Sequence, residues 1–173
     1  MILAWRQACG DKPVPSAVII DSRSCQSAPT CFTRGFDGGK KIKGIKVHLA
    51  VDKYGFPLAI NVSPANVHDS KGIVPVLHQL AGFKGTALGD LSYRGQRLAG
   101  EALGITIQPS AGGHGGTFIP EGIRVERSLA WISRYRRLNT IFERGHLVAF
   151  IEIAFISILS RRLVRLGTQE ISA

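Results

Sequence analysis

Cysteine is scarce in this sequence of 173 residues, and the three that occur, Cys9, Cys25 and Cys31, include no CxxC pair. An odd number of cysteines without paired spacing predicts neither a disulfide framework nor a structural zinc site. This usage is typical of a reducing compartment, and we expect a cytoplasmic protein.

Acidic residues are also scarce. Asp and Glu number 12 against 22 Lys and Arg, which gives a net charge of +10 and a pI of about 10.1. Such a surplus favours an anionic partner, either nucleic acid or an anionic membrane surface. It disfavours a glycosidase built on paired carboxylates, because a positive charge gives no reason to bind a neutral sugar.

No apolar run in the sequence is long enough to span a bilayer. The longest, LVAFIEIAFISIL at 147–159, falls short of the roughly 20 residues required and contains Glu152. It predicts a buried helix, and we expect no membrane partner. Arg161, Arg162 and Arg165 follow the run and leave a weaker membrane-surface role open.

Hydrophobic patterning predicts alternating strands and helices. The expected elements are a strand at 17–20 that ends at Asp21, a loop at 22–44, a hairpin with strands at 46–52 and from 56, a helix at 69–80, strands at 86–88 and 105–107, a small helix at 96–103, a long helix that contains Glu126, and a last helix that begins near Gly145 or His146. This order predicts an α/β fold with one mixed sheet. We expect one domain at 16–165 between an N-terminal tail at 1–15 and a C-terminal tail at 166–173.

Three acids stand out because of their positions. Asp21 ends the first predicted strand, Asp90 follows the strand at 86–88, and Glu126 begins a basic helix. Ligands gather at the ends of neighbouring strands in such sheets, and carboxylates are hard ligands suited to Mg²⁺ or Mn²⁺. Two ions held by three converging acids would serve both oxygens of a phosphoryl displacement. The alternative is a turn or cap role for each aspartate, and a helix-start carboxylate or arginine partner in Glu126.

The segment RVERSLAWISRYRRL at 124–138 surrounds Glu126 with arginines. On one continuous helix, a first side would carry Glu126, Ala130, Ser133, Arg134 and Arg137, and a second, core-facing side would carry Val125, Leu129, Ile132 and Tyr135. A metal-binding carboxylate followed by phosphate-binding cations fits a DNA end, whereas a solvated face with surface ion pairs would look the same.

Five segments occur in order, and at compatible spacing, between about Pro13 and Leu163: VIIDSRS, RGFDGGKKIKGIKVHLAVDKYG, SPANVHDS, GDLSYRG and RVERSLAWISRYRRL. Together they resemble the catalytic half of bacterial DDE transposases of the insertion sequence five family. The resemblance implies an RNase H-like mixed sheet flanked by helices. It also implies a catalytic and metal-binding triad of Asp21, Asp90 and Glu126 that holds two Mg²⁺ (or Mn²⁺) ions. In that family, water attacks at the transposon end, and the freed 3′-hydroxyl then attacks target DNA.

Basic and aromatic residues near these segments are the candidate DNA contacts. They are Lys40, Lys41, Lys43, Lys46, Tyr93, Arg94, Arg127, Arg134 and Arg137. Arg134 takes the place of the family's basic residue about two turns after the glutamate. Gly122 and Ile45 stand where arginine is common in the family, and Ser92 where glycine is common. For the lysines, an ordinary solvated loop is the alternative.

Family members usually carry an N-terminal helical region that recognises terminal inverted repeats, and this sequence starts just before the first catalytic strand. We therefore expect the downstream reading frame of a frameshifted element, or a remnant, that does not find transposon ends unaided. The expected partners are transposon-end and target DNA, further copies of the chain on DNA, and an upstream-frame transposase product. The expected setting is the bacterial nucleoid.

Two other functions stay open at this point. A catalytically idle remnant would bind DNA non-specifically or pair with an upstream-frame product. An RNase H-type nuclease would use the same charge and metal site on RNA–DNA hybrids, although the arginine-rich helix and the late glutamate favour a transposase. Whether Asp21, Asp90 and Glu126 meet distinguishes the transposase from the idle remnant.

Overall fold

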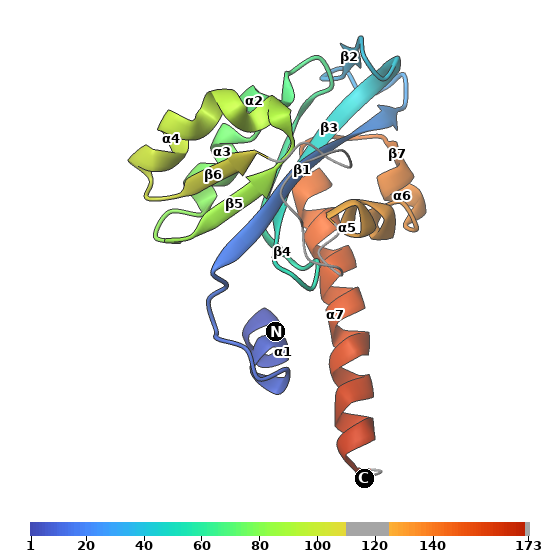
Figure 1. Ribbon diagram of the computed structural model, residues 1–173. Coiled ribbons are helices and arrows are strands. Elements are labelled where there is room, and N and C mark those ends of the chain that lie inside the picture. The colour runs from blue at the N-terminus through green and yellow to red at the C-terminus, as the bar shows by residue number, and fades with distance from the viewer. Residues whose placement is uncertain (110–124, 172–173) are drawn as a thin grey trace.

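The computed structural model describes residues 1–109 and 125–171, and these form one curled sheet of seven strands with helices on both faces (Figure 1). The strands are β1 (Ala17–Ser27), β2 (Gly35–Asp37), β3 (Ile42–Val51), β4 (Pro57–Pro64), β5 (Thr86–Gly89), β6 (Thr106–Pro109) and β7 (Thr140–Ile141). The helices are α1 (Ile2–Ala8), α2 (Asp69–Gly72), α3 (Val74–Gln79), the 3₁₀ helix η1 (Leu91–Gln96), α4 (Arg97–Ala102), α5 (Val125–Ile132), α6 (Arg136–Asn139) and α7 (Leu147–Ile171).

The strand order defines the topology. The five main strands lie in the order β4-β3-β1-β5-β6. β3 runs antiparallel to β4 and to β1, whereas β5 is parallel to β1 and β6 is parallel to β5. This mixed sheet is consistent with the predicted RNase H-like fold, and the predicted α/β class is confirmed.

β1 is longer than the sequence predicted. Residues 19–26 pair with β3 on one edge, so the strand continues through Ser27 and its predicted end at Asp21 is wrong. On its other edge β1 has two short parallel neighbours, β5 opposite residues 17–19 and β7 opposite Gln26 and Ser27. No described strand covers residues 20–25 on that edge. Asp21 therefore lies in a gap between two strands.

Alternation along β1 assigns its side chains to two faces of the sheet. Val18 and Ile20 belong to the buried cluster that includes α3 and η1, whereas Ile19 and Cys25 belong to the cluster that includes α5 and α7. Successive side chains of a strand point to opposite faces. Asp21, an odd-numbered position, therefore faces the α5 side of the sheet.

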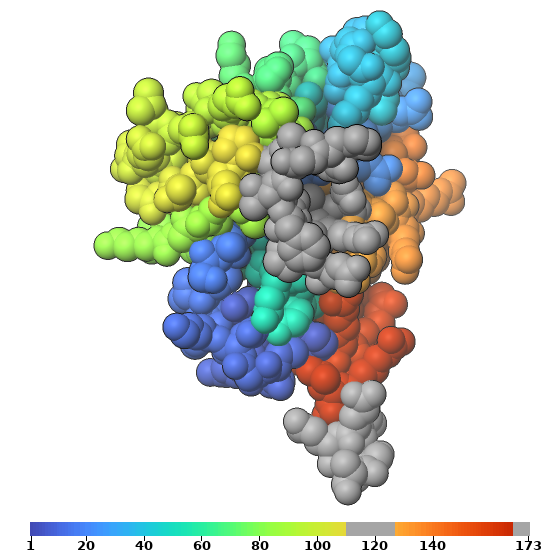
Figure 2. Space-filling model, viewed as in Figure 1, coloured from blue at the N-terminus to red at the C-terminus, as the bar shows by residue number. Residues whose placement is uncertain are grey.

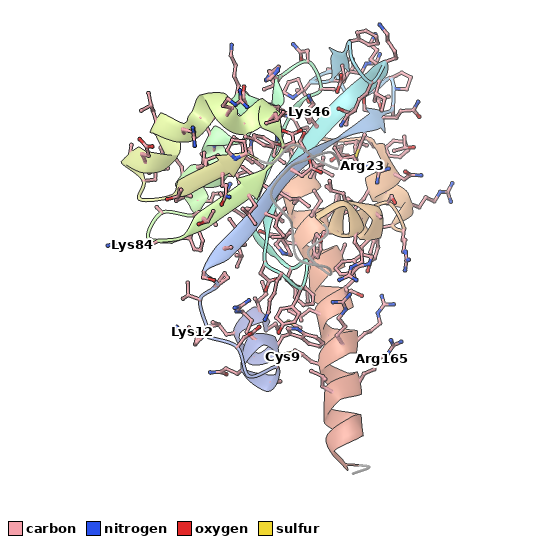
Figure 3. The ribbon with its side chains drawn as sticks, in the orientation of Figure 1. Cys9, Lys12, Arg23, Lys46, Lys84 and Arg165 are labelled. Atoms are coloured by element: carbon pink, nitrogen blue, oxygen red, sulfur yellow. The ribbon has the colours of Figure 1, made fainter. Side chains whose placement is uncertain are left out.

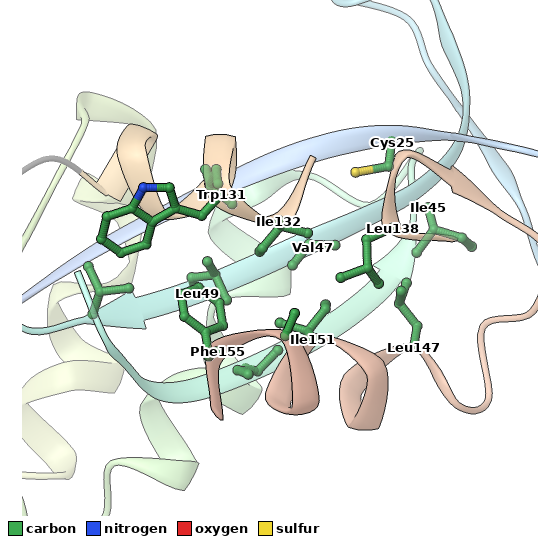
Figure 4. Close-up of a cluster of buried hydrophobic side chains, with 14 of the residues drawn as sticks. Cys25, Ile45, Val47, Leu49, Trp131, Ile132, Leu138, Leu147, Ile151 and Phe155 are labelled. Atoms are coloured by element: carbon green, nitrogen blue, oxygen red, sulfur yellow. The ribbon is translucent and has the colours of Figure 1, made fainter. Parts of the chain in front are cut away.

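The larger cluster fixes α5 and α7 against the sheet. Its members include Val47 and Leu49 of β3, Trp131 and Ile132 of α5, and Leu147, Ile151 and Phe155 of α7 (Figure 4). Burial of each large apolar side chain contributes about 1.5–3 kcal/mol, so this cluster holds α5 firmly over β1. Trp131 is a core residue.

Both predicted tails are helical. α1 lies within the predicted N-terminal tail and packs beside α7, blue against red in Figure 2. Arg6 fixes it there, because its Nη1 lies 3.1 Å from Asp52 Oδ2 with both side chains buried. α7 continues through the predicted C-terminal tail to Ile171. None of the helices in the described ranges is long and apolar enough to cross a membrane.

Two helices that the sequence predicted as continuous are interrupted. The helix expected at 69–80 is divided into α2 and α3, and Pro75 lies in the first turn of α3. The helix expected across 124–138 ends at Ile132, and Tyr135 adopts an extended conformation as the N-cap of α6. The chain turns here because β7 must reach β1. Arg134 and Arg137 therefore do not share one helical face with Glu126.

Candidate active site

Strand register relates the positions of Asp21 and Asp90. β1 and β5 are parallel, and their pairs run from Ala17 opposite Thr86 to Ile19 opposite Leu88. Extended by two residues, the same register would place Asp21 level with Asp90. Leu88 packs against the same cluster as Ile19, so the alternation that turns Asp21 toward α5 applies to β5 as well.

Asp90 follows β5 directly, as predicted, and begins the 3₁₀ helix η1. Its Oδ1 accepts a hydrogen bond of 2.8 Å from the Ser92 amide and a second from the Ser92 hydroxyl. The carboxylate is exposed. Capping therefore fixes the aspartate at the strand end and leaves it open to solvent.

Tyr93 gives independent evidence that acids gather at this place. Its side chain is fully buried, and its hydroxyl makes no hydrogen bond of ordinary geometry among the described residues, although Ser22 is near. Burial raises the Tyr93 pKa, and the negative charges of Asp21, Asp69 and Asp90 raise it further. Asp21, Asp69 and Asp90 are therefore all near enough to Tyr93 to disfavour its ionised form.

α5 carries Glu126 in its first turn and packs on the Asp21 face of the sheet. Arg23 of β1 donates from Nη1 to the Leu129 carbonyl at 3.0 Å, and the Ser128 hydroxyl donates to the Gly55 carbonyl at 2.7 Å. The Arg23 bond fixes α5 over β1 two residues beyond Asp21, and the Ser128 bond fixes it to the turn between β3 and β4. The Glu126 side chain lies outside the described residues, as do Gly122 and His114.

A buried ion cluster borders the acids on the opposite face of the sheet. The Lys46 ammonium lies 2.8 Å from Asp69 Oδ1 and 3.5 Å from Asp37 Oδ2, and it donates to the Val67 carbonyl at 2.9 Å. Burial opposes ionisation of Asp69, but hydrogen bonds from Lys46 and Ser22 and the Lys46 charge hold its pKa below the ordinary value. Hydrogen bonds from Ser24 and the backbone lower the pKa of Asp37 to about 2.

Sequence reasoning missed this cluster. Lys46 was predicted as a DNA contact, with a solvated loop as the alternative, and Asp69 as the start of a helix. One signal was available, since Ser22, Ser24, Lys46 and His48 alternate along two strands and therefore share one face. Polar residues repeated on one face of a central strand indicate partners brought from elsewhere in the chain.

The candidate DNA contacts divide by exposure. Seven of them have exposed side chains: Lys40, Lys41, Lys43, Arg94, Arg127, Arg134 and Arg137. Lys46 is only 5% exposed and Tyr93 is fully buried. We leave Lys46 and Tyr93 out of the DNA contacts, because Lys46 is occupied by two carboxylates and Tyr93 does not reach the surface.

The donor set at this place fits a divalent metal in part. Asp21 and Asp90 would supply two hard carboxylate ligands, and Mg²⁺ is bound in proteins by one or two carboxylates together with substrate phosphates. Asp69 is engaged by Lys46. Among the residues that the structure describes, no group of three His, Cys, Asp or Glu side chains is arranged to hold a metal ion.

The order and directions of the strands are those of an RNase H-like fold. The chain belongs to the transposase DDE domain family, whose model matches residues 12–107, more than half of the sequence. The match includes Asp21 and Asp90 and ends before Glu126. No curated protein matches the chain. Membership implies a transposase-type enzyme with a DNA substrate.

Proposed function

We propose that the chain is the catalytic domain of an insertion-sequence transposase that cleaves DNA ends and transfers the strands. The register of β1 and β5, which when extended by two residues would bring Asp21 level with Asp90, supports this proposal most strongly, because α5 with Glu126 packs on the same face of the sheet. Asp21, Asp90 and Glu126 would together hold two Mg²⁺ or Mn²⁺ ions. Such ions stabilise the attacking and leaving oxygens of a phosphoryl displacement.

The protein's own residues would position these ligands. The Ser22 amide donates to Asp21 Oδ1 at 2.7 Å, and the Ser92 amide donates to Asp90 Oδ1 at 2.8 Å. Each bond fixes the direction of its carboxylate. Lys46 and Asp69 tie β3 to α2 next to Tyr93, so that the strand and the helix behind the acids keep their positions.

DNA would lie along the exposed cations. Lys40 and Lys41 occupy the turn between β2 and β3, Lys43 lies at the start of β3, and Arg94 lies on η1 four residues after Asp90. Arg127, Arg134 and Arg137 would bind phosphates on the α5–α6 side. Contacts of this kind position DNA without reading its sequence, so binding would weaken steeply as salt rises.

The finer assignments are part of the same proposal. The five matching segments support the insertion sequence five family, a bacterial source and action in the cytoplasm near the nucleoid. The proposed partners are transposon-end DNA, target DNA, further copies of the chain on DNA and an upstream-frame transposase product. DNA binding that does not change with salt concentration would count against the DNA partners.

Nicking of supercoiled plasmid in Mn²⁺ tests the activity without knowledge of the inverted repeats. We expect the native chain to convert plasmid to the open circle, and Asp21→Asn or Asp90→Asn to reduce this rate at least about a hundredfold, as loss of a metal-held charge-stabilising group does. The matched control is Glu101→Gln, which removes an exposed acid of α4.

Full nicking by both aspartate variants would refute the catalytic assignment. No nicking by the native chain, combined with salt-sensitive DNA binding, would instead identify a catalytically idle DNA-binding domain.

A further inference from the structure

A groove of about 370 Å³ lies between the end of α5 and the outer part of α7. Four arginines line it, Arg134, Arg161, Arg162 and Arg165, together with Trp131 and Tyr135. Residues from two helices far apart in sequence therefore combine in one strongly positive surface. Arg161, Arg162 and Arg165 had been considered only for a membrane surface.

Aromatic rings hold one of these arginines in place. The guanidinium of Arg162 lies 4.3 Å from the centroid of the Trp131 ring, 5.1 Å from that of Phe56 and 5.9 Å from that of Trp5. Arg127 lies 5.3 Å from the centroid of the same Trp131 ring. Burial, and then the charge of Arg127, lower the Arg162 pKa. Two cations are thus concentrated on one indole.

A second arginine is braced by its own helix. Arg161 donates from Nη2 to the Ser157 hydroxyl at 2.8 Å and from Nε to the Ser157 carbonyl at 3.3 Å. These bonds limit the rotation of a side chain that is otherwise costly to order. The remaining N–H groups of the Arg161 guanidinium can donate to a further acceptor.

The groove has little acid to balance its charge. Within the described ranges, Arg134, Arg161 and Arg162 form no ion pair with a carboxylate. Neighbouring like charges repel one another, and an anion that entered the groove would relieve that repulsion. Planar guanidinium groups match phosphate oxygens in geometry as well as in charge.

We propose that this arginine groove binds the phosphodiester backbone of DNA next to the active site, and the proposal rests on DNA being the substrate. α5 links the two places, since Trp131 follows Glu126 by five positions, about 7.5 Å along the helix axis. That distance corresponds to roughly two phosphates along one strand of B-DNA. The groove would hold a strand whose neighbouring phosphates lie at the acids.

The test measures DNA binding without catalysis. Every chain carries Asp21→Asn and is titrated in EDTA against a short labelled duplex of random sequence, at several salt concentrations, by fluorescence anisotropy. Arg134→Gln with Arg161→Gln removes one charge from each wall of the groove and leaves the half-buried Arg162 in place. Lys12→Gln with Lys84→Gln is the matched control, because it removes two exposed charges on the side of the molecule away from Arg165 (Figure 3).

We expect the groove variant to lose about tenfold in affinity at moderate salt, and its slope of log K against log salt to fall in magnitude by about 2. The control should keep the slope of its parent. Arg134→Lys with Arg161→Lys should keep the slope and lose part of the affinity, because lysine keeps the charge but lacks the paired N–H donors of the guanidinium.

Slopes that change equally in the groove variant and the control would overturn the proposal. A free polyphosphate is the other source of the same chemistry, and inorganic pyrophosphate probes it by calorimetry. Tight pyrophosphate binding that the groove variant loses, with DNA binding unchanged, would also overturn it. Failure of the proposed catalysis would appear separately, as absent nicking by the native chain, since this titration uses neither metal nor cleavage.

Discussion

The Lys46 ammonium lies 2.8 Å from Asp69 Oδ1, and this pair joins the centre of β3 to the first turn of α2. Lys46 is nearly buried, with a side chain 6% exposed, and Asp37 is its second carboxylate neighbour at 3.5 Å. Lys46 lies between the carboxylates of Asp37 and Asp69 and stabilises both of them. It also keeps α2 and η1 behind Asp21 and Asp90.

Lys46→Ala should lower the free energy of unfolding by about 2–4 kcal/mol, because it leaves two poorly solvated carboxylates without a cation. Urea denaturation at neutral pH measures this loss. Lys43→Ala is the matched control, since Lys43 is exposed on the same strand, and it should change stability by less than about 0.5 kcal/mol. Equal effects of the two substitutions would mean that the ion cluster contributes nothing to stability.

His48 should make the protein sensitive to mild acid. Its ring is fully buried against Gly72, with Nε2 2.9 Å from the Ser63 hydroxyl, and burial lowers its pKa from 6.5 to about 4. Between about pH 6.5 and 4, His48 is therefore protonated in the unfolded chain and neutral in the folded chain. The unfolding free energy should fall as pH drops from about 6.5 to 4, by on the order of 3 kcal/mol.

Urea denaturation at intervals across that pH range measures the slope. His48→Asn should remove most of it, whatever constant cost the substitution carries. His78→Gln, a change at an exposed histidine of α3, should leave the slope intact. A native chain whose stability is flat between pH 6.5 and 4.5 would contradict the prediction.

Two ion pairs near the N-terminus should differ in energy. Arg6 and Asp52 are both buried, and Asp52 Oδ1 also accepts hydrogen bonds from the Tyr54 and Phe56 amides. Arg6→Ala should cost about 3–5 kcal/mol in thermal or urea unfolding, because Asp52 would stay buried without its cation. Lys53→Ala, which breaks the exposed pair with Asp11, should cost about 1 kcal/mol or less. A reversed order would show that α1 does not pack firmly.

The sequence predicted those parts of the fold that depend on local patterning. The hairpin of β3 and β4, the strand before Asp90 and the core side of α5 were correct, because apolar alternation and helical spacing alone determine them. β1 was predicted too short, since Arg23 and the two serines after Asp21 look like a loop. Their partners, Leu129 and Asp37, come from distant segments.

The candidate site was predicted in the same uneven way. Asp90 directly follows β5, as predicted, whereas Asp21 lies inside β1 and not at its end. The buried state of Lys46 and Tyr93 was missed, because a lysine among lysines and a tyrosine beside an arginine resemble surface residues. The end of α5 at Ile132 was missed because no glycine or proline marks it; β7 pairing with β1 imposes it.

Titration calorimetry with Mn²⁺ is the decisive test of the proposal that Asp21, Asp90 and Glu126 form one metal site. We expect saturable binding by the native chain, loss of that binding in Asp21→Asn, Asp90→Asn and Glu126→Gln, and unchanged binding in Glu101→Gln. Binding that is absent in the native chain, or that survives all three site substitutions, would contradict it.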